Sequence, residues 1–351
     1  MLANKGILKS WPNRLSRSEY KISAVRNFLR LPLELLDSLE LNDAIIVSKI
    51  SKILLKITRN SKSVEESKFR LVFTRLFPWD PLVTYEQSPI DIFILTHEKD
   101  IDILPYSILG AVESIKDNLR NVFIVAPSHS ENKVKSIISN IYQTASYISD
   151  EEILDEHLRN IWITIPTVPR MEILKICCGL LSPTGNALII DGDTILLRSR
   201  VWSNSNKCVA IVAQEYLKRH LNFNKNRMGI DLNLGIGFVS HHGVAVKKTL
   251  SKFISQNGGI VRLAEEFKES YLKFKNPEDD FPSEWQLISD LNIFSDPINT
   301  ELVKFSNYGM SRDATNFQFS YNDESAEVAK VLANFRAECP KLGSISFHGY
   351  K

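Results

Sequence analysis

The stretch at residues 187–196, ALIIDGDTIL, runs four apolar residues directly into two aspartates that a single glycine separates. Apolar residues of this kind are typical of a buried strand, whereas Asp191 and Asp193 repel each other at close range unless a positive charge lies between them. Carboxylate oxygens are hard ligands of the kind that Mg²⁺ and Mn²⁺ prefer. The stretch therefore predicts a site for a divalent cation, Mn²⁺ or Mg²⁺, at the end of a buried strand.

Other common motifs for phosphate or metal chemistry are absent from the sequence. Residues 235–238, GIGF, are comparable with a dinucleotide-binding loop, but they lack its third glycine and the helix that should follow. The sequence contains no G-x-x-x-x-G-K-[ST], H-E-x-x-H or G-x-S-x-G pattern. The aspartate pair is therefore the strongest chemical signal.

Apolar strands alternate with helices around this pair. Strands are predicted at residues 90–97, 121–129, 161–166 and 186–191, and helices at residues 104–119, 150–160 and 171–181. This alternation predicts an α/β fold in which helices flank a Rossmann-like, mostly parallel central sheet and ligands bind at the carboxyl ends of the strands. Polar residues lie at these ends, namely Thr96, His97, Ser128, His129 and the two aspartates.

After residue 200 the alternation weakens. Residues 228–243 are predicted to form a strand that ends in His241 and His242, and helices are predicted at 244–258, at 263–274 and from Ser283 onward. The segment 202–220 could form either a strand or a helix. One α/β domain at 86–351, preceded by a helical extension at 1–85, is the simplest arrangement.

The 351 residues have a formal net charge of +2, but residues 1–75 contain 15 Lys and Arg against 7 Asp and Glu. This excess of basic residues predicts contact with an anionic membrane surface or another polyanion, or else only a solvated basic face. No nucleic-acid partner is predicted. Adjacent Cys177 and Cys178 in an apolar stretch suit core thiols of a reducing compartment. No apolar run reaches the roughly 20 residues that cross a bilayer, so we expect a cytoplasmic protein that is either free or peripheral at the inner face of the membrane.

The segments IDIFILTH, NVFIVAP, MEILKICCGLL and ALIIDGDTIL, in this order, resemble the nucleotide-sugar-binding half of GT-A fold glycosyltransferases. FVSHHG followed by SEW is more specifically similar to a poorly characterised group of bacterial glycosyltransferase-like proteins. The resemblance covers roughly residues 88–351. It implies a nucleotide-sugar-binding half at 86–200 and an acceptor-binding half at 201–351. The basic region at 1–85 has no counterpart in it.

The resemblance also implies roles for individual residues. In that superfamily the D-x-D motif binds the cation that holds the diphosphate, so Asp193 would ligate the metal and Asp191 would contact the metal or the ribose. A late histidine often adds a metal ligand, here His348. In the glycogenin-like branch a glycine and a lysine then contact the diphosphate, and Gly349 and Lys351 supply these residue types at a shorter spacing. Residues expected to line the nucleotide or reach the diphosphate or donor sugar are Thr96, His97, Arg170 and Lys175.

Glu284 is the candidate catalytic base. Ser283 is a suitable N-cap, and the helix dipole favours a carboxylate in the first turn. Inverting GT-A enzymes commonly place an acidic base at such a helix start, so inversion is slightly preferred over retention. Trp285 is predicted either to stack on a sugar ring, of the acceptor or the donor, or to fill the core. Of His241 and His242, which alternate in facing along a strand, at most one is predicted to contact the acceptor or the donor sugar.

The predicted function is metal-dependent transfer of a sugar from a nucleotide-sugar donor to a glycan or lipid-linked acceptor, in bacterial surface polysaccharide synthesis. One alternative is a phosphatase of the haloacid dehalogenase type, because IIDGDT also fits its D-x-D-x-T motif with Asp191 as nucleophile. That class needs a second acidic pair leaving a buried strand, and the adjacent Asp279 and Asp280 lie in a polar loop. A non-catalytic transferase-like binding subunit is the other alternative.

Overall fold

The computed structural model describes residues 86–348, except for 116, 205–206, 214–216, 233–236, 277–278, 298, 304–306, 313–316 and 340–341. The predicted helical extension at 1–85, its boundary with the α/β domain and its membrane contact lie outside the described residues, and so do Gly349 and Lys351. Within the described part of the chain, no helix is both long and apolar enough to cross a membrane.

A five-stranded sheet forms the centre of the fold. Its strands, in spatial order, are β3 (Ser146–Ser149), β2 (Leu119–Ala126), β1 (Ile90–Leu95), β4 (Asn186–Asp191) and β8 (His242–Val246). The first four are parallel, and β8 runs antiparallel to β4. Every residue of β1 is buried, which agrees with the continuous apolar run of a strand covered on both faces. The predicted mostly parallel sheet is therefore confirmed.

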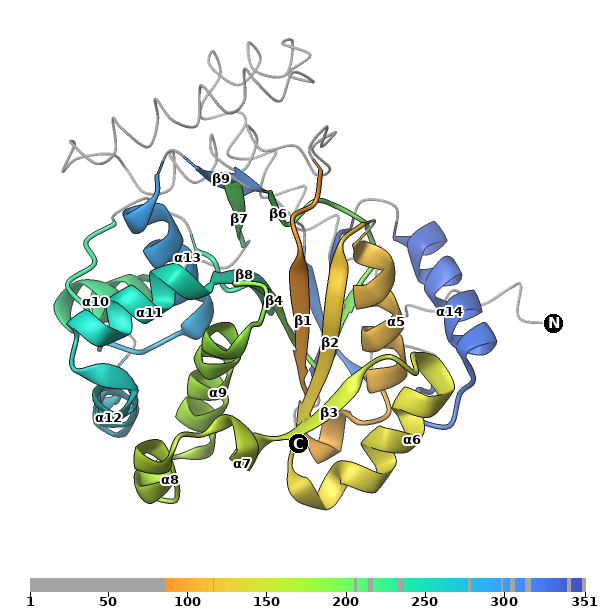
Figure 1. Ribbon diagram of the computed structural model, residues 1–351, viewed down its shortest axis with the longest axis horizontal. Helices are drawn as coiled ribbons and strands as arrows, with labels where there is room; N and C mark the ends of the chain where they lie inside the picture. The colour runs from red at the N-terminus through yellow and green to blue at the C-terminus, as the bar shows by residue number, and fades with distance from the viewer. Residues whose placement is uncertain are drawn as a thin grey trace, which may run out of the picture.

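Helices cover both faces of this sheet (Figure 1). Along β1, Ile92 and Ile94 belong to one core while Phe93 and Leu95 belong to the other, because successive side chains point to opposite faces. The first core includes residues of α5 (Leu104–Ser114), α6 (Glu131–Ile141) and α14 (Ser325–Glu338). The second includes residues of α9 (Thr167–Leu181), α11 (Lys247–Gln256), α12 (Gly259–Lys273) and α13 (Glu284–Ser295).

Two three-stranded sheets accompany the central one. The first has the order β10 (Asn307–Ser311), β11 (Ser344–His348) and β5 (Thr194–Leu196), and the second has the order β6 (Ser203–Asn204), β7 (Lys207–Ile211) and β9 (Thr300–Val303). The chain leaves the central sheet at Asp191, passes Gly192 and Asp193, and enters the first small sheet at Thr194. The aspartate pair is thus the link between two sheets.

Gly192 is required in this link for reasons of space. Its amide donates to the Leu95 carbonyl at 2.6 Å, and its carbonyl accepts a bond from the Ser107 hydroxyl at 2.8 Å. A Cβ atom at this position would lie 2.7 Å from the Thr96 side chain and 2.8 Å from the Leu95 carbonyl oxygen. No side chain fits there unless the backbone of the strand end moves.

The predicted third strand at 161–166 is wrong. Its first residues complete α8 (Glu156–Trp162), and Thr164 and Ile165 lie in the turn before α9. The reason is local, because Asp155 caps this helix by accepting a bond from the Leu158 amide at 2.7 Å. The acidic segment at 150–160 is split into α7 (Asp150–Ile153) and α8. The actual third strand, β3, has the short and partly exposed sequence SYIS, which gives a weak signal.

The predicted strand at 228–243 is also wrong. In its described part, residue 237 forms only an isolated bridge, and β8 begins at His242, where the predicted strand nearly ended. His241 has a left-handed φ of 61°, so the chain turns there before it extends. The predicted helix at 244–258 begins later, at Lys247, because the preceding residues complete β8. The segment 202–220, for which a strand and a helix were both possible from the sequence, contains strands β6 and β7 and the start of α10 (Lys218–Asn226).

Substituting Gly192 with alanine should lower the free energy of unfolding by about 1–3 kcal/mol, the usual cost of overpacking, because the strand end must shift. Urea denaturation measures this change. Gly229→Ala is the control, since φ is 69° at Gly229 and an added Cβ would meet no atom within 4 Å. Gly229→Ala should lower the free energy of unfolding by about 1 kcal/mol, through backbone strain alone. A Gly192→Ala protein as stable as the wild type would contradict the close contact with Leu95.

Candidate functional site

Main-chain bonds bring two distant segments to the aspartate pair. The Asp191 amide donates to the His241 carbonyl at 3.0 Å, and the Phe347 amide donates to the Asp193 carbonyl at 2.8 Å. Both contacts lie at the carboxyl end of β4, where ligands are expected in a parallel sheet. The two predicted aspartates, a predicted histidine and the last described strand therefore meet at one place.

Asp193 and His348 lie next to each other. Asp193 Oδ2 is 3.3 Å from His348 Nδ1, and the two side chains are 13% and 19% exposed, so both reach the surface. Their proximity follows from the register of β5 and β11, in which Thr194 pairs with Ser346, and the two hydroxyl groups of this pair are 2.7 Å apart. The structure thus brings together the carboxylate and the imidazole that the metal hypothesis requires.

Asp191 forms an ion pair with the buried ammonium group of Lys175. Its Oδ1 lies 2.6 Å from Lys175 Nζ, and the same ammonium group also pairs with Glu284 Oε1. Burial raises the pKa of Asp191, but Lys175 and His241 outweigh this effect and hold the pKa well below its usual range. Burial likewise lowers the pKa of Lys175, and the two carboxylates more than compensate, so the net effect raises it. Asp191 and Lys175 therefore remain ionised at neutral pH.

A further carboxyl group, which the sequence analysis missed, lies one helical turn before Lys175. Glu172 is buried, and its Oε2 has no hydrogen-bond partner among the described residues. Burial, followed by the charge of Glu284, raises the pKa of Glu172 well above its usual value, although Lys175 acts in the opposite direction. Two charged residues at positions i and i+3 of the otherwise apolar MEILKICCGLL were the available signal.

The two adjacent histidines have different environments. His241 Nδ1 is 3.0 Å from Asp191 Oδ2, and its ring centre lies 4.7 Å from that of His348. Burial lowers the pKa of His241, but its bond to Asp191 and that residue's charge produce a net increase. His242 is completely buried, with Nδ1 2.6 Å from the Ser240 carbonyl oxygen, and its ring meets Trp202 edge-on. Only His241 faces the aspartates, so sugar contact by His242 has no support.

Four other residues predicted from the sequence, namely Thr96, His97, Arg170 and Trp285, have different surroundings. Thr96 is buried against Gly192. His97 precedes the short helix η1 (Glu98–Asp100), and its buried Nδ1 has no hydrogen-bond partner in the part of the chain that the structure describes. Arg170 donates to the Ile165 carbonyl in the first turn of α9, a local bond that does not include the aspartates. Trp285 is only 3% exposed, and the centre of its ring lies 4.7 Å from Lys175 Nζ. It supports the lysine from the core and has no open face for a sugar.

A second ion pair, absent from the sequence analysis, borders the Asp193–His348 pair. Arg312, which directly follows β10, pairs with Asp100 of η1 and donates to the Lys99 carbonyl. Burial, and next the charge of Asp193, raises the pKa of Asp100 to about 6, although Lys99 and Arg312 act in the opposite direction. Asp100 and Arg312 are 212 positions apart, so no local pattern could have joined them.

The cluster fits a divalent cation only in part. A carboxylate and an imidazole are suitable donors for Mn²⁺, and Asp193 and His348 supply one of each. Asp191 does not complete the set as it stands, because Lys175 and His241 occupy its two oxygens. Across the described ranges, no group of three or more His, Cys, Asp or Glu side chains is arranged to hold a metal ion. The predicted three-ligand set is therefore reduced to a two-residue pair.

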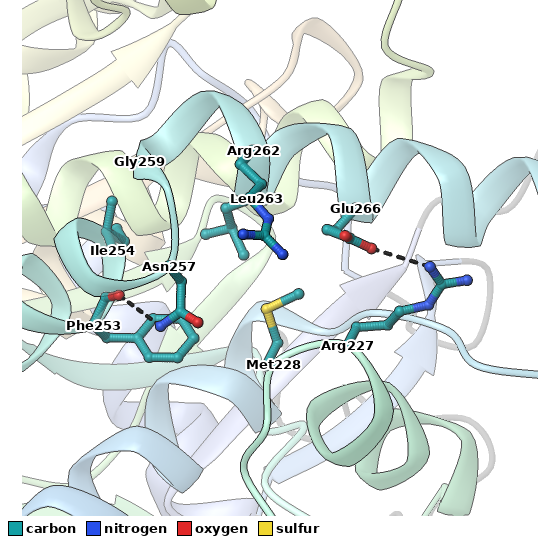
Figure 2. A pocket seen from close by; sticks show the side chains of 9 residues that line it. All are labelled: Arg227, Met228, Phe253, Ile254, Asn257, Gly259, Arg262, Leu263 and Glu266. Atoms are coloured by element: carbon teal, nitrogen blue, oxygen red, sulfur yellow. Dashed lines mark hydrogen bonds and ion pairs between the residues drawn. The ribbon is translucent and has the colours of Figure 1, made fainter.

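A hollow elsewhere in the molecule contains none of these residues. Figure 2 shows it between the end of α10, α11 and α12, with the Arg227–Glu266 ion pair at one side. Its lining residues are Arg227, Met228, Phe253, Ile254, Asn257, Gly259, Arg262, Leu263 and Glu266. Because this lining includes neither aspartate, the hollow is separate from the candidate site.

Replacing Lys175 with methionine should destabilise the protein by about 3–5 kcal/mol, because two buried carboxylates lose their shared cation. The free energy of unfolding in urea measures the effect. Lys135→Met is the matched control, since Lys135 pairs with Glu131 on an exposed helix face and should contribute less than about 1 kcal/mol. The double change Lys175→Met with Glu284→Gln should recover part of the loss. Equal costs for the two lysines would contradict a buried, charge-compensating role.

The pH dependence of stability tests the burial of His242. Burial lowers the pKa of His242 to about 3, so in acid the unfolded chain binds a proton at this residue that the native protein does not. The wild type should therefore lose about 1.4 kcal/mol per pH unit through His242 as the pH falls from about 6 to 4. His242→Gln should remove this contribution from the slope. Ser240→Ala, which deletes the hydroxyl bond to the His242 carbonyl, should change the stability by a constant amount. Parallel pH profiles for wild type and His242→Gln would refute the argument.

No protein-family model and no curated protein matches this sequence. One similar solved structure is mouse xyloside xylosyltransferase 1, with a TM-score of 0.40 and 11% identity over 64% of this chain and 88% of that one. A second is the bifunctional glycosyltransferase WbbM, with a TM-score of 0.36 and 11% identity over 77% of this chain and 47% of that one. A third is the galactosyltransferase LgtC in complex with donor and acceptor sugar analogues, with a TM-score of 0.40 and 11% identity over 74% of this chain and 87% of that one. The names of all three describe glycosyltransferases.

Proposed function

We propose that this protein is a metal-dependent glycosyltransferase that moves a sugar from a nucleotide-sugar donor to a glycan or lipid-linked acceptor. The observation that carries the proposal is the contact between Asp193 and His348, beside Asp191, at the carboxyl end of β4. Three residues chosen from the sequence for one chemical task meet there, although His348 is 155 positions beyond Asp193.

Asp193 and His348 would hold the cation, Mn²⁺ or Mg²⁺. Once bound, such a cation would act as a Lewis acid and neutralise charge on the leaving nucleoside diphosphate. Lys175 contributes a fixed positive charge that Asp191 and Glu284 orient from both sides. His97, at the end of β1, would line the nucleotide, whereas Thr96 is buried against Gly192 and has no exposed surface for this contact. Contact between Lys351 and the diphosphate stays a prediction.

Glu284 remains our proposed base, and its environment adds a second role. It is the first residue of α13, and Ser283 caps this helix by accepting a bond from the Gln286 amide. One of its oxygens pairs with Lys175, and the other, on a side chain that is only 4% exposed, is the one proposed to receive a proton from an acceptor hydroxyl. A base at this position supports inversion of the sugar. The same carboxylate also holds Lys175 in place against Asp191.

The place of the reaction in the cell is a further part of the proposal. A role in bacterial surface polysaccharide synthesis rests on the similarity of FVSHHG and SEW to bacterial glycosyltransferase-like proteins. A cytoplasmic location, with peripheral contact through residues 1–75, would bring a lipid-linked acceptor close to the site. His241 is the proposed sugar contact among the paired histidines, because it alone lies beside Asp191.

The phosphatase alternative is weaker in light of the structure. That chemistry needs Asp191 free to attack a phosphorus atom, and both of its oxygens are paired. Asp279 accepts bonds from the amides of Lys275 and Asn276 in an exposed loop, so it does not leave a buried strand with Asp280. A non-catalytic binding subunit would keep the same contacts, and turnover of a donor separates it from the transferase.

A screen of nucleotide sugars by thermal shift, with and without Mn²⁺, tests the proposal. A donor at 100 times its dissociation constant should stabilise the wild type by about 2.7 kcal/mol when Mn²⁺ is present. Asp193→Asn should abolish the Mn²⁺-dependent part of this stabilisation and the sugar transfer, while Asp231→Asn, at an exposed pair with Lys225, should change neither. An equal response in Asp193→Asn and wild type would reject the metal site. Release of phosphate from simple phosphomonoesters, without sugar transfer, would favour the phosphatase.

A further inference from the structure

Arg312 places a guanidinium group beside the proposed metal pair. It follows Ser311, which pairs with His348 in the ladder of β10 and β11. Its Nε donates to the Phe347 carbonyl at 3.4 Å, one residue before His348. The backbone of the metal-binding strand and the side chain of Arg312 are therefore in direct contact.

Two further contacts fix the orientation of this guanidinium group. Nη2 pairs with Asp100, and Nη1 donates to the Lys99 carbonyl. These bonds and the one to Phe347 use three of the five N–H donors that an arginine has, one on each nitrogen. The side chain is 24% exposed, so it also reaches solvent. A guanidinium group held in this way is ready to give its remaining donors to an anion without losing much conformational entropy.

The charges nearby indicate which anion it would bind. Asp100 is close enough to Asp193 and Asp191 for their charges to raise the pKa of its carboxyl group. Arg312 is thus a permanent positive charge near the aspartate pair that reaches solvent, whereas Lys175 is a buried positive charge that contacts Asp191. A group with several anionic oxygens can contact a cation at Asp193 and His348 and, at the same time, a planar guanidinium beside it.

We propose that Arg312 binds the diphosphate group of the donor, with Asp100 as the residue that positions it. This inference rests on the proposed function, because it requires the donor to occupy the carboxyl end of β4. It adds a phosphate contact that neither the D-x-D motif nor the FHGYK tail predicted. Arg312 contacts the substrate, whereas Asp100 acts only through Arg312.

Arg336 offers a matched control in the same chain. It also bridges separate elements, pairing with Glu113 of α5 at 2.6 Å and donating to the Leu197 carbonyl at 3.0 Å. Its side chain is 30% exposed, close to the value for Arg312. The difference is location, because Arg336 lies on α14 beside α5 and its contacts involve none of the residues of the aspartate cluster. Loss of a bridging arginine as such should have similar structural effects at both positions.

The experiment measures binding of UDP, GDP, ADP and dTDP to the full-length protein in Mn²⁺ by calorimetry. For a diphosphate that the wild type binds, Arg312→Ala should weaken affinity by about 10- to 100-fold, since charged hydrogen bonds are lost. Affinity for the corresponding nucleoside, measured by NMR titration, should not change. Arg312→Lys should have an intermediate effect, because it keeps the charge but not the planar fork. Arg336→Ala should bind like the wild type.

Asp100→Asn separates substrate binding from structural support. It removes the ion pair of a largely buried carboxyl group but leaves the guanidinium in place, so diphosphate affinity should fall by less than in Arg312→Ala, and nucleoside affinity should not change. If Asp100→Asn and Arg312→Ala lose affinity for nucleoside and nucleoside diphosphate in equal proportion, Arg312 is only structural and the inference is wrong. Diphosphate affinity unchanged in Arg312→Ala also overturns it. Absence of any nucleotide binding to the wild type would instead reject the proposed function itself.

Discussion

The buried ammonium group of Lys175 is the interaction on which the site depends. It lies between Asp191 at the end of β4 and Glu284 at the start of α13, so one positive charge joins the central sheet to two helices. Removing three ionised groups from water is costly, and only close pairing offsets that cost. The position of Glu284 is therefore set by the lysine as much as by its own helix cap. Any movement of α9 would displace both carboxylates together.

A second buried aspartate of the central sheet shows what a purely structural carboxylate looks like. Asp91, on β1, accepts bonds from Asn121, from Ser182 and from both the amide and the hydroxyl of Thr184. These partners are neutral, and together they give the carboxylate four hydrogen bonds. Asp191 is instead held by Lys175 and His241, two groups that carry or can acquire a positive charge. Charged partners at a partly exposed strand end are the costlier arrangement, which is consistent with a functional role.

The sequence predicted those features whose signal is local. Continuous apolar runs identified β1 and β4, and the Ser283 cap identified α13. Burial of a strand and capping of a helix each require particular residue types within a few positions, so both can be recognised in the sequence. The strand expected at 161–166 was wrong because its apolar alternation competes with a helix that begins at the Asp155 cap. Pairs such as Lys175 with Glu284, 109 positions apart, have no local pattern. Only the fold brings such residues together, so the ion pairs of the site could not be predicted.

The balance of charge at the carboxyl end of β4 explains why metal dependence and diphosphate binding belong in the same proposal. Among the described residues, the carboxyl groups of Asp100, Asp191, Asp193 and Glu284 lie there, against the cations Lys175 and Arg312 and, beside Asp100, Lys99. Such an edge repels a diphosphate unless more positive charge is added. His241, whose pKa is raised, supplies part of this charge when protonated, and a divalent cation would supply more. The buried half of the cluster, around Lys175, then fixes the geometry. The outer half, around Asp193 and Arg312, would change its charge when the metal and the donor bind.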